Sequence, residues 1–152
     1  MEEYRRILVP VDGSDLSKKA FRKATSLAKK FGSEVAIIHV YERLPGSWGI
    51  PGMEGLDLPV EQIIEQTKEA AERLTREYEK IGKEMGVEIS SSMVEGDPAD
   101  EIIKTSDEFD MIVMGTHGRG GLLHLLIGST AERVARHACC PVFLIREKKK
   151  GC

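Results

Sequence analysis

Strand-like segments alternate with amphipathic helices along the chain, and this order most constrains the fold. Four segments are largely apolar, at residues 7–11, 35–41, 109–114 and 141–145, with His39 and Asp110 as exceptions, and a half-exposed one at residues 87–94 alternates apolar and polar side chains. In the intervening segments, apolar residues recur at helical spacing. Alternation of this kind predicts an α/β fold: a doubly wound, five-stranded parallel sheet with helices on both faces and right-handed crossovers.

The predicted helices carry end signals. Ser14 or Asp15 can cap a first helix, which Gly32 would end. Asp97 followed by Pro98 fits the start of a short helix that runs to about residue 107. The longest helix is expected over residues 60–85, and its predicted buried stripe consists of Val60, Ile63, Ile64, Thr67, Ala70, Ala71, Leu74, Tyr78, Ile81 and Met85.

The composition is that of a soluble globular protein. Its 152 residues, 41% hydrophobic and 31% charged, fit one domain, which we assign to residues 1–147 with a polar tail at 148–152. The net charge of −3 gives no reason to propose nucleic-acid binding. The sequence has no apolar run of about 18 residues and no signal-peptide pattern, and its three cysteines suggest no disulfide framework, so we expect a cytoplasmic protein without a membrane partner.

A glycine-rich stretch at residues 115–130 is the candidate ligand site. Glycines crowd its start, from Gly115 and Gly118 onward, and Gly128 stands just before the last helix. Glycine lets backbone N–H groups approach an anion, and a helix N-terminus adds unpaired N–H groups and the positive end of the dipole. Neither a Walker A lysine nor a dinucleotide fingerprint is present. On chemistry alone two interpretations stay open: a phosphate cradle, or a plain turn in which Ser129 begins a capping box.

The glycine spacing also carries a resemblance. Gly115, two residues, Gly118, nine residues, then Gly128-Ser129-Thr130 resembles the nucleotide-binding motif of the universal stress protein family, in its ATP-binding branch. Segments 7–14, 96–99 and 140–142 agree with it, and the resemblance extends from about Tyr4 to Arg146. It implies an adenine nucleotide alpha hydrolase-like sheet of strand order 3-2-1-4-5. Ligands of such sheets lie where the strand order reverses.

The resemblance implies roles for individual residues. Backbone groups of Pro10, Val11 and Val40 would border an adenine, while Asp12 would lie near the ribose and phosphates. An Asx turn is the plainer interpretation of Asp12. Glu132 would repel phosphate unless it points away or a metal intervenes. The residues expected at the site are Pro10, Val11, Asp12, Val40, Met114, Gly115, His117, Gly118, Arg119, Gly120, Gly128, Ser129, Thr130 and Ala131.

The expected ligand is ATP or AMP, with Mg²⁺ or Mn²⁺ held mainly by the phosphates, near Asp12. We therefore expect a nucleotide-dependent stress-response or signalling module with slow or no hydrolysis, because the sequence shows no evident general base and no P-loop lysine. The alternatives are a metal-dependent ATPase and a nucleotide-free dimeric interaction protein. The resemblance also implies a homodimer, in which the last strand, Val142 to Ile145, pairs with its copy.

Two further features have both a plain and a functional interpretation. Residues 42–59 are rich in glycine and proline, which suits either a flap near the ligand or a surface connection. His39 stands within an apolar run, where a hydrogen-bonded core residue is a better prediction than a ligand.

Overall fold

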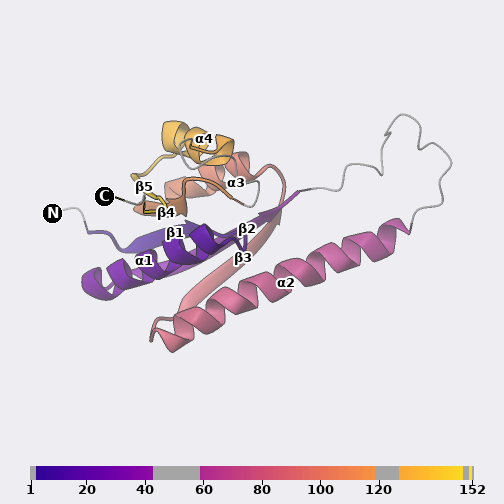
Figure 1. Ribbon diagram of the computed structural model, residues 1–152, viewed down its shortest axis with the longest axis horizontal. Helices are drawn as coiled ribbons and strands as arrows, with labels where there is room; N and C mark the ends of the chain where they lie inside the picture. The colour runs from indigo at the N-terminus through magenta and orange to yellow at the C-terminus, as the bar shows by residue number, and fades with distance from the viewer. Residues whose placement is uncertain (1–2, 43–58, 119–126, 149–150, 152) are drawn as a thin grey trace.

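The fold is a five-stranded parallel sheet with helices on both faces. A computed structural model describes residues 3–42, 59–118, 127–148 and 151 (Figure 1). The strand order is β3-β2-β1-β4-β5, as expected. The strands are β1 (Arg6–Pro10), β2 (Glu34–Tyr41), β3 (Ile89–Glu95), β4 (Met111–Gly115) and β5 (Val142–Ile145). The helices are α1 (Asp15–Phe31), α2 (Val60–Glu84), α3 (Pro98–Thr105) and α4 (Ser129–His137), with a 3₁₀ turn η1 (Ser106–Glu108).

Two apolar cores lie on the two faces of the sheet. Because successive side chains of a strand point to opposite faces, Ile7 and Val9 of β1 contribute to one core and Leu8 to the other. Helices α1 and α2 cover the first face, while α3 and α4 cover the second (Figure 1). The central strands are therefore buried on both sides, which explains why their sequences are continuously apolar.

Local signals fix most of the helix ends. Ser14 caps α1 by accepting a hydrogen bond from Ser17 N at 3.1 Å, and Gly32 ends that helix with φ of 71°. Asp97 caps α3 by accepting from Asp100 N at 3.0 Å, and Pro98 takes the first helical position. The predicted starts of these two helices are thus confirmed.

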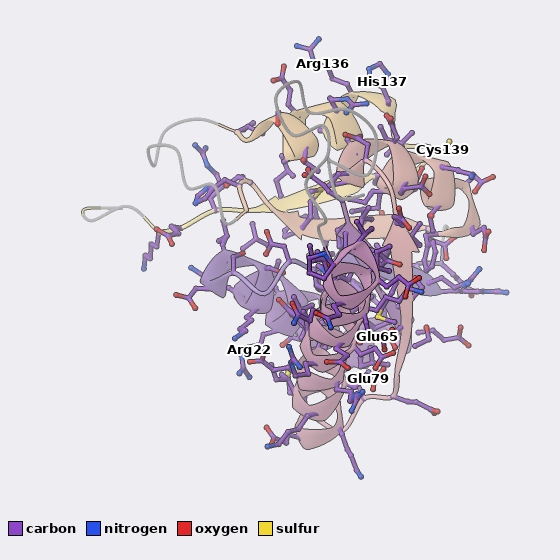
Figure 2. The ribbon with its side chains drawn as sticks, turned by 90° about the vertical axis from the view of Figure 1, so that its right-hand side faces the viewer. Arg22, Glu65, Glu79, Arg136, His137 and Cys139 are labelled. Carbon is purple, nitrogen blue, oxygen red and sulfur yellow. The ribbon has the colours of Figure 1, made fainter. Side chains whose placement is uncertain are left out.

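The capping box that the plain-turn interpretation of Ser129 requires does not form. Helix α4 begins at Ser129 itself, Gly128 is its N-cap, and no side chain in the described part of the chain caps it. The cause is tertiary: Gly128 N donates to Thr116 O at 2.6 Å, so Gly128 lies beside the end of β4 and the helix begins after it. Glu132 pairs instead with Arg136 at 2.8 Å, and Figure 2 shows Arg136 and His137 projecting from α4 away from the sheet.

The predicted stripe of α2 is only partly buried. Ala71, Tyr78 and Ile81 are buried, but Ile64 is 43% exposed and Ala70 is exposed as well. The N-terminal turns of α2 extend past the end of the sheet (Figure 1). A helix of 25 residues is about 38 Å long, whereas the eight residues of β2 span only about 26 Å. The first turns therefore lack a partner among the described residues.

Other boundaries differ slightly from the predictions. The short helix ends at Thr105 and continues as η1, and Phe109 N closes that turn on Ser106 O at 3.2 Å, so β4 begins only at Met111. Strand β3 lies at the sheet edge, as expected. Residues 43–58, which hold most of the glycine- and proline-rich segment, lie outside the described residues. Within the described ranges, no helix has the length and apolar character that crossing a membrane requires.

Candidate functional site

A pocket opens at the carboxyl ends of the strands, beside the point where the strand order reverses. Its volume is about 560 Å³. Strand β1 lies between β2 and β4, so the chain leaves β1 and β4 on either side of this reversal, where doubly wound sheets hold their ligands. The lining residues are Pro10, Val11, Asp12, Ser17, Ile38, Val40, Glu42, Pro98, Ile102, Met114, Gly115, His117, Gly118, Ile127, Gly128, Ser129, Thr130 and Ala131.

The structure brings together every predicted site residue that it describes. The two remaining ones, Arg119 and Gly120, lie outside the described residues. The residues after β1 and those after β4 therefore line one pocket, although about a hundred positions separate them in the sequence.

The start of α4 supplies hydrogen-bond donors to the pocket. The first intrahelical bond runs from Glu132 N to Gly128 O at 2.9 Å, so the N–H groups of Ser129, Thr130 and Ala131 precede it. All three residues line the pocket, and within the described residues no side chain caps this helix. In contrast to α1 and α3, helix α4 thus leaves unpaired N–H groups and the positive end of its dipole available to a ligand.

Close approach of the two loops explains two of the glycines. A Cβ atom at Gly118 would lie 2.4 Å from Asp12 Oδ2. A Cβ atom at Gly128 would lie 3.2 Å from Thr116 O and 3.3 Å from His117 Cα. Side chains at these positions would push the segment after β4 away from Asp12 or from the start of α4.

The turn after β1 offers an acceptor rather than donors. Asp12 Oδ1 accepts from Ser14 N at 2.9 Å, so the Asx-turn interpretation is confirmed. Asp12 N donates to Ser17 Oγ at 3.2 Å, and Gly13 N donates to the Tyr78 hydroxyl at 3.1 Å. Three successive N–H groups are thereby used inside the protein. What this side of the pocket presents is Asp12 Oδ2, which faces Gly118.

The backbone of Val11 is also engaged. Val11 N donates to Ile38 O at 2.9 Å, and Val11 O lies 2.8 Å from Nδ1 of His39. Since a carbonyl oxygen only accepts, Nδ1 of His39 carries the hydrogen in this bond. His39 is therefore a hydrogen-bonded, half-buried core residue, as predicted, and Val11 lines the pocket although its side chain is buried in the core.

Comparison with known proteins identifies the family. The family model described as "Universal stress protein family" matches residues 3–146. The chain belongs to the universal stress protein family. Universal stress protein MJ0531 of Methanocaldococcus jannaschii is 40% identical over 149 residues, which cover 97% of this chain and 85% of that protein.

Solved universal stress proteins share the fold. UspA from Lactobacillus plantarum superimposes with a TM-score of 0.80 at 24% identity, covering 96% of this chain and 100% of that one. A universal stress protein from Archaeoglobus fulgidus, solved in complex with dAMP, gives a TM-score of 0.65 at 28% identity and covers 95% of this chain and 100% of its own. The predicted family and strand order are thus confirmed.

Sequence reasoning missed six pocket residues of this universal stress protein. Three of them stand close to the carboxyl edge of the sheet: Ser17 in the first turn of α1, Glu42 just after β2, and Pro98 at the start of α3. Their proximity to strand ends was a usable signal, because all carboxyl ends of a parallel sheet meet at one edge. The other missed residues are Ile38, Ile102 and Ile127.

Proposed function

We propose that this universal stress protein binds an adenine nucleotide, ATP or AMP, in the pocket at the ends of β1 and β4. The observation that carries the proposal is the uncapped start of α4, which opens into the pocket where the strand order reverses. A volume of about 560 Å³ lies within the usual range of small-molecule sites. The complex of the related Archaeoglobus fulgidus protein with dAMP supports an adenine nucleotide as the ligand.

The two walls of the pocket suit different parts of a nucleotide. The amides of Ser129, Thr130 and Ala131 suit the phosphates, with Gly115 and Gly118 allowing close approach and Arg119 adding a charged contact. The apolar surface of Pro10, Val11, Val40 and Met114 suits the adenine ring. Each wall thus offers the chemistry that its part of the ligand requires.

Asp12 suits a hydroxyl group or a cation. Its Oδ2 atom is a negatively charged acceptor, so bare phosphate would be repelled there. A ribose hydroxyl can donate to it, and a Mg²⁺ or Mn²⁺ ion held mainly by the phosphates can use it as one oxygen ligand. Glu132 does not oppose phosphate binding, because it is paired with Arg136 on the outer side of α4.

We infer that the bound nucleotide regulates the protein and that its hydrolysis does not drive the function. It would act as a cytoplasmic stress-response or signalling module that hydrolyses ATP slowly or not at all, since the chain has no P-loop lysine. A metal-dependent ATPase is the second candidate, favoured by the position of Asp12 Oδ2 in the pocket. Turnover assays on the wild type and Asp12→Asn separate the two. Equal rates, together with tight ATP binding, exclude the ATPase.

The binding site is tested by the substitution Gly128→Val. Its side chain would meet Thr116 O and His117 Cα, so it would displace the start of α4 from β4. We expect ATP binding, measured by calorimetry, to be lost while the far-UV circular dichroism stays unchanged. Mass spectrometry of nucleotide copurified with the wild type distinguishes ATP from AMP.

Gly32→Ala is the matched control for this test. A Cβ atom at Gly32 meets no other atom within 4 Å, but the φ of 71° makes alanine unfavourable by about 1 kcal/mol. This variant is thus destabilised without touching the pocket, and its ATP affinity should equal that of the wild type. Retained ATP affinity in Gly128→Val would contradict the proposed site.

We further propose that two copies associate through β5. Within the described residues β5 pairs only with β4, and its Phe143 is 52% exposed. Pairing with a second β5 would cover this open edge.

A further inference from the structure

Tyr78 of α2 is a fully buried residue whose hydroxyl group reaches the turn after β1. Its ring packs edge-on against Phe21, with the ring centroids 5.3 Å apart and the planes at 85°. The hydroxyl accepts a hydrogen bond from Gly13 N at 3.1 Å and lies 2.9 Å from Ser17 Oγ. One polar partner of this side chain, Gly13, thus lies in the turn after β1, and the other, Ser17, lies in the first turn of α1.

A chain of hydrogen bonds continues from Tyr78 to Asp12. Ser17 Oγ accepts from Asp12 N at 3.2 Å, and Ser14 N donates to Asp12 Oδ1 at 2.9 Å. Gly13, between them, has a φ of 82°, in the left-handed region. The hydroxyl groups of Tyr78 and Ser17 therefore fix the backbone of this turn by accepting hydrogen bonds from Gly13 N and Asp12 N. The geometry of the turn then decides where Asp12 Oδ2 points.

The hydroxyl of Tyr78 is not needed to fill the core. A phenylalanine would occupy nearly the same volume without placing a polar group among Phe21 and the other apolar side chains of this face. Burial raises the pKa of the Tyr78 hydroxyl, while its hydrogen bonds with Ser17 and Gly13 act in the opposite direction. The group thus remains protonated and can both accept from Gly13 N and donate to Ser17 Oγ.

We infer that Tyr78 is a positioning residue for the nucleotide pocket: through Gly13 and Ser17, its hydroxyl fixes the turn that aims the Asp12 carboxylate at the ligand. This inference rests on the proposed nucleotide binding. It makes α2, which contributes no residue to the pocket lining, part of the machinery that sets ligand affinity. A shift of α2 relative to α1 would therefore change the position of the Asp12 carboxylate and, through it, the affinity for the ligand.

The substitution Tyr78→Phe tests the inference. We expect the affinity for ATP to fall by up to about five-fold, because binding must then order a turn that this hydrogen bond had ordered beforehand. Amide hydrogen exchange at Gly13, measured without nucleotide, should become faster because its acceptor is gone. Thr75→Val is the matched control: Thr75 is buried one turn away on α2, its hydroxyl bonds Glu72 O, and neither ATP affinity nor Gly13 exchange should change.

A double-mutant cycle with Asp12→Ala separates positioning from general loosening of the fold. If Tyr78 acts through Asp12, Tyr78→Phe should cost no further affinity once the carboxylate is absent. Additive effects would overturn the inference. Ser17→Ala, which removes the second hydroxyl, should also be non-additive with Asp12→Ala. It replaces Tyr78→Phe in the cycle if Tyr78→Phe fails to fold.

The outcomes distinguish this inference from the proposed function. Wild-type binding of ATP with unchanged affinity in Tyr78→Phe would overturn the role of Tyr78 and leave nucleotide binding intact. Absence of ATP and AMP binding by the wild type would overturn both.

Discussion

Asp97 links the two helices that flank the pocket. Its Oδ2 atom accepts from Asp100 N at 3.0 Å, which caps α3, and from a guanidinium nitrogen of Arg133 at 2.9 Å, which reaches over from α4. Arg133 also pairs with Asp100. The backbone hydrogen bond from Asp100 and then the Arg133 guanidinium hold the pKa of the Asp97 carboxyl below its usual value. Pro98, next in sequence, lines the pocket, so this pairing helps to fix the pocket wall.

The lowered pKa of Asp97 predicts a pH-dependent contribution to stability. Because the folded-state pKa lies below the unfolded-state value of about 3.8, the carboxylate stabilises the protein above that pH, and the contribution disappears as pH falls through the folded-state pKa. Asn at position 97 can still cap the helix but carries no charge. We expect Asp97→Asn to be less stable at pH 7 by at most about 1 kcal/mol, since the pair is half exposed.

Urea unfolding at several pH values measures this difference. It should shrink below pH 3.8 and also in high salt, which screens the Arg133 pair. A difference that is independent of pH would mean that the charge of Asp97 contributes nothing and only its capping geometry matters.

Single residues were predictable where the deciding interaction is local. The first helix begins after Ser14 and ends at Gly32, and α3 begins after Asp97, in each case through bonds to near neighbours in sequence. The glycine spacing was likewise recognisable without a structure. The sequence left two interpretations of Ser129 open, because its role depends on a bond from Gly128 to Thr116, twelve positions earlier. The capping pattern in the sequence carries no trace of that bond.

At the level of elements, α2 shows what periodicity cannot reveal. The repeat of apolar residues identifies which face of the helix packs against the sheet. It does not show how many turns of the helix the sheet covers, because that depends on the length of the strands. Because the sheet is shorter than α2, Ile64 is exposed while Ile81, five turns later on the same face, is 8% exposed. The prediction was therefore right for the face and wrong for its extent.

The two ends of α2 should respond differently to truncation of an isoleucine. Ile81→Ala should cost about 2–4 kcal/mol of unfolding free energy, because it leaves a cavity in the core. Ile64→Ala, the control on the exposed turns, should change the unfolding free energy by no more than about 0.5 kcal/mol. Urea unfolding measures both. An equally large loss for Ile64→Ala would mean that the first turns of α2 are covered in solution.

At the scale of the whole molecule, alternation of strands and helices was enough to predict a parallel sheet and the edge at which a ligand site would lie. The strand order came only from the family resemblance, because periodicity does not say which strands are neighbours. The contribution of α3 to the pocket, through Pro98 and Ile102, was missed for a related reason. It depends on how α3 and α4 pack together across the second face, which no local pattern encodes.

The two edges of the sheet differ in a way that predicts how the molecule associates. The β3 edge carries Ser90, Ser91 and Ser92, polar residues that disfavour pairing with another sheet. The β5 edge carries the half-exposed Phe143 between Val142 and Leu144. A two-fold axis beside β5 would pair it with its own copy and turn two five-stranded sheets into one continuous sheet.

Phe143→Asp should therefore separate the proposed dimer into monomers. In the paired state the two introduced carboxylates would lie near each other across the axis, and like charges close together destabilise strand pairing. We expect the dimer dissociation constant, measured by analytical ultracentrifugation, to rise at least about ten-fold, since a loss of only about 1.4 kcal/mol has that effect. Met93→Asp, at the 40% exposed methionine of β3, is the control and should leave the dimer intact. A wild-type protein that stays monomeric at high micromolar concentration would rule out association through β5, and dissociation by Met93→Asp alone would assign the contact to the opposite edge.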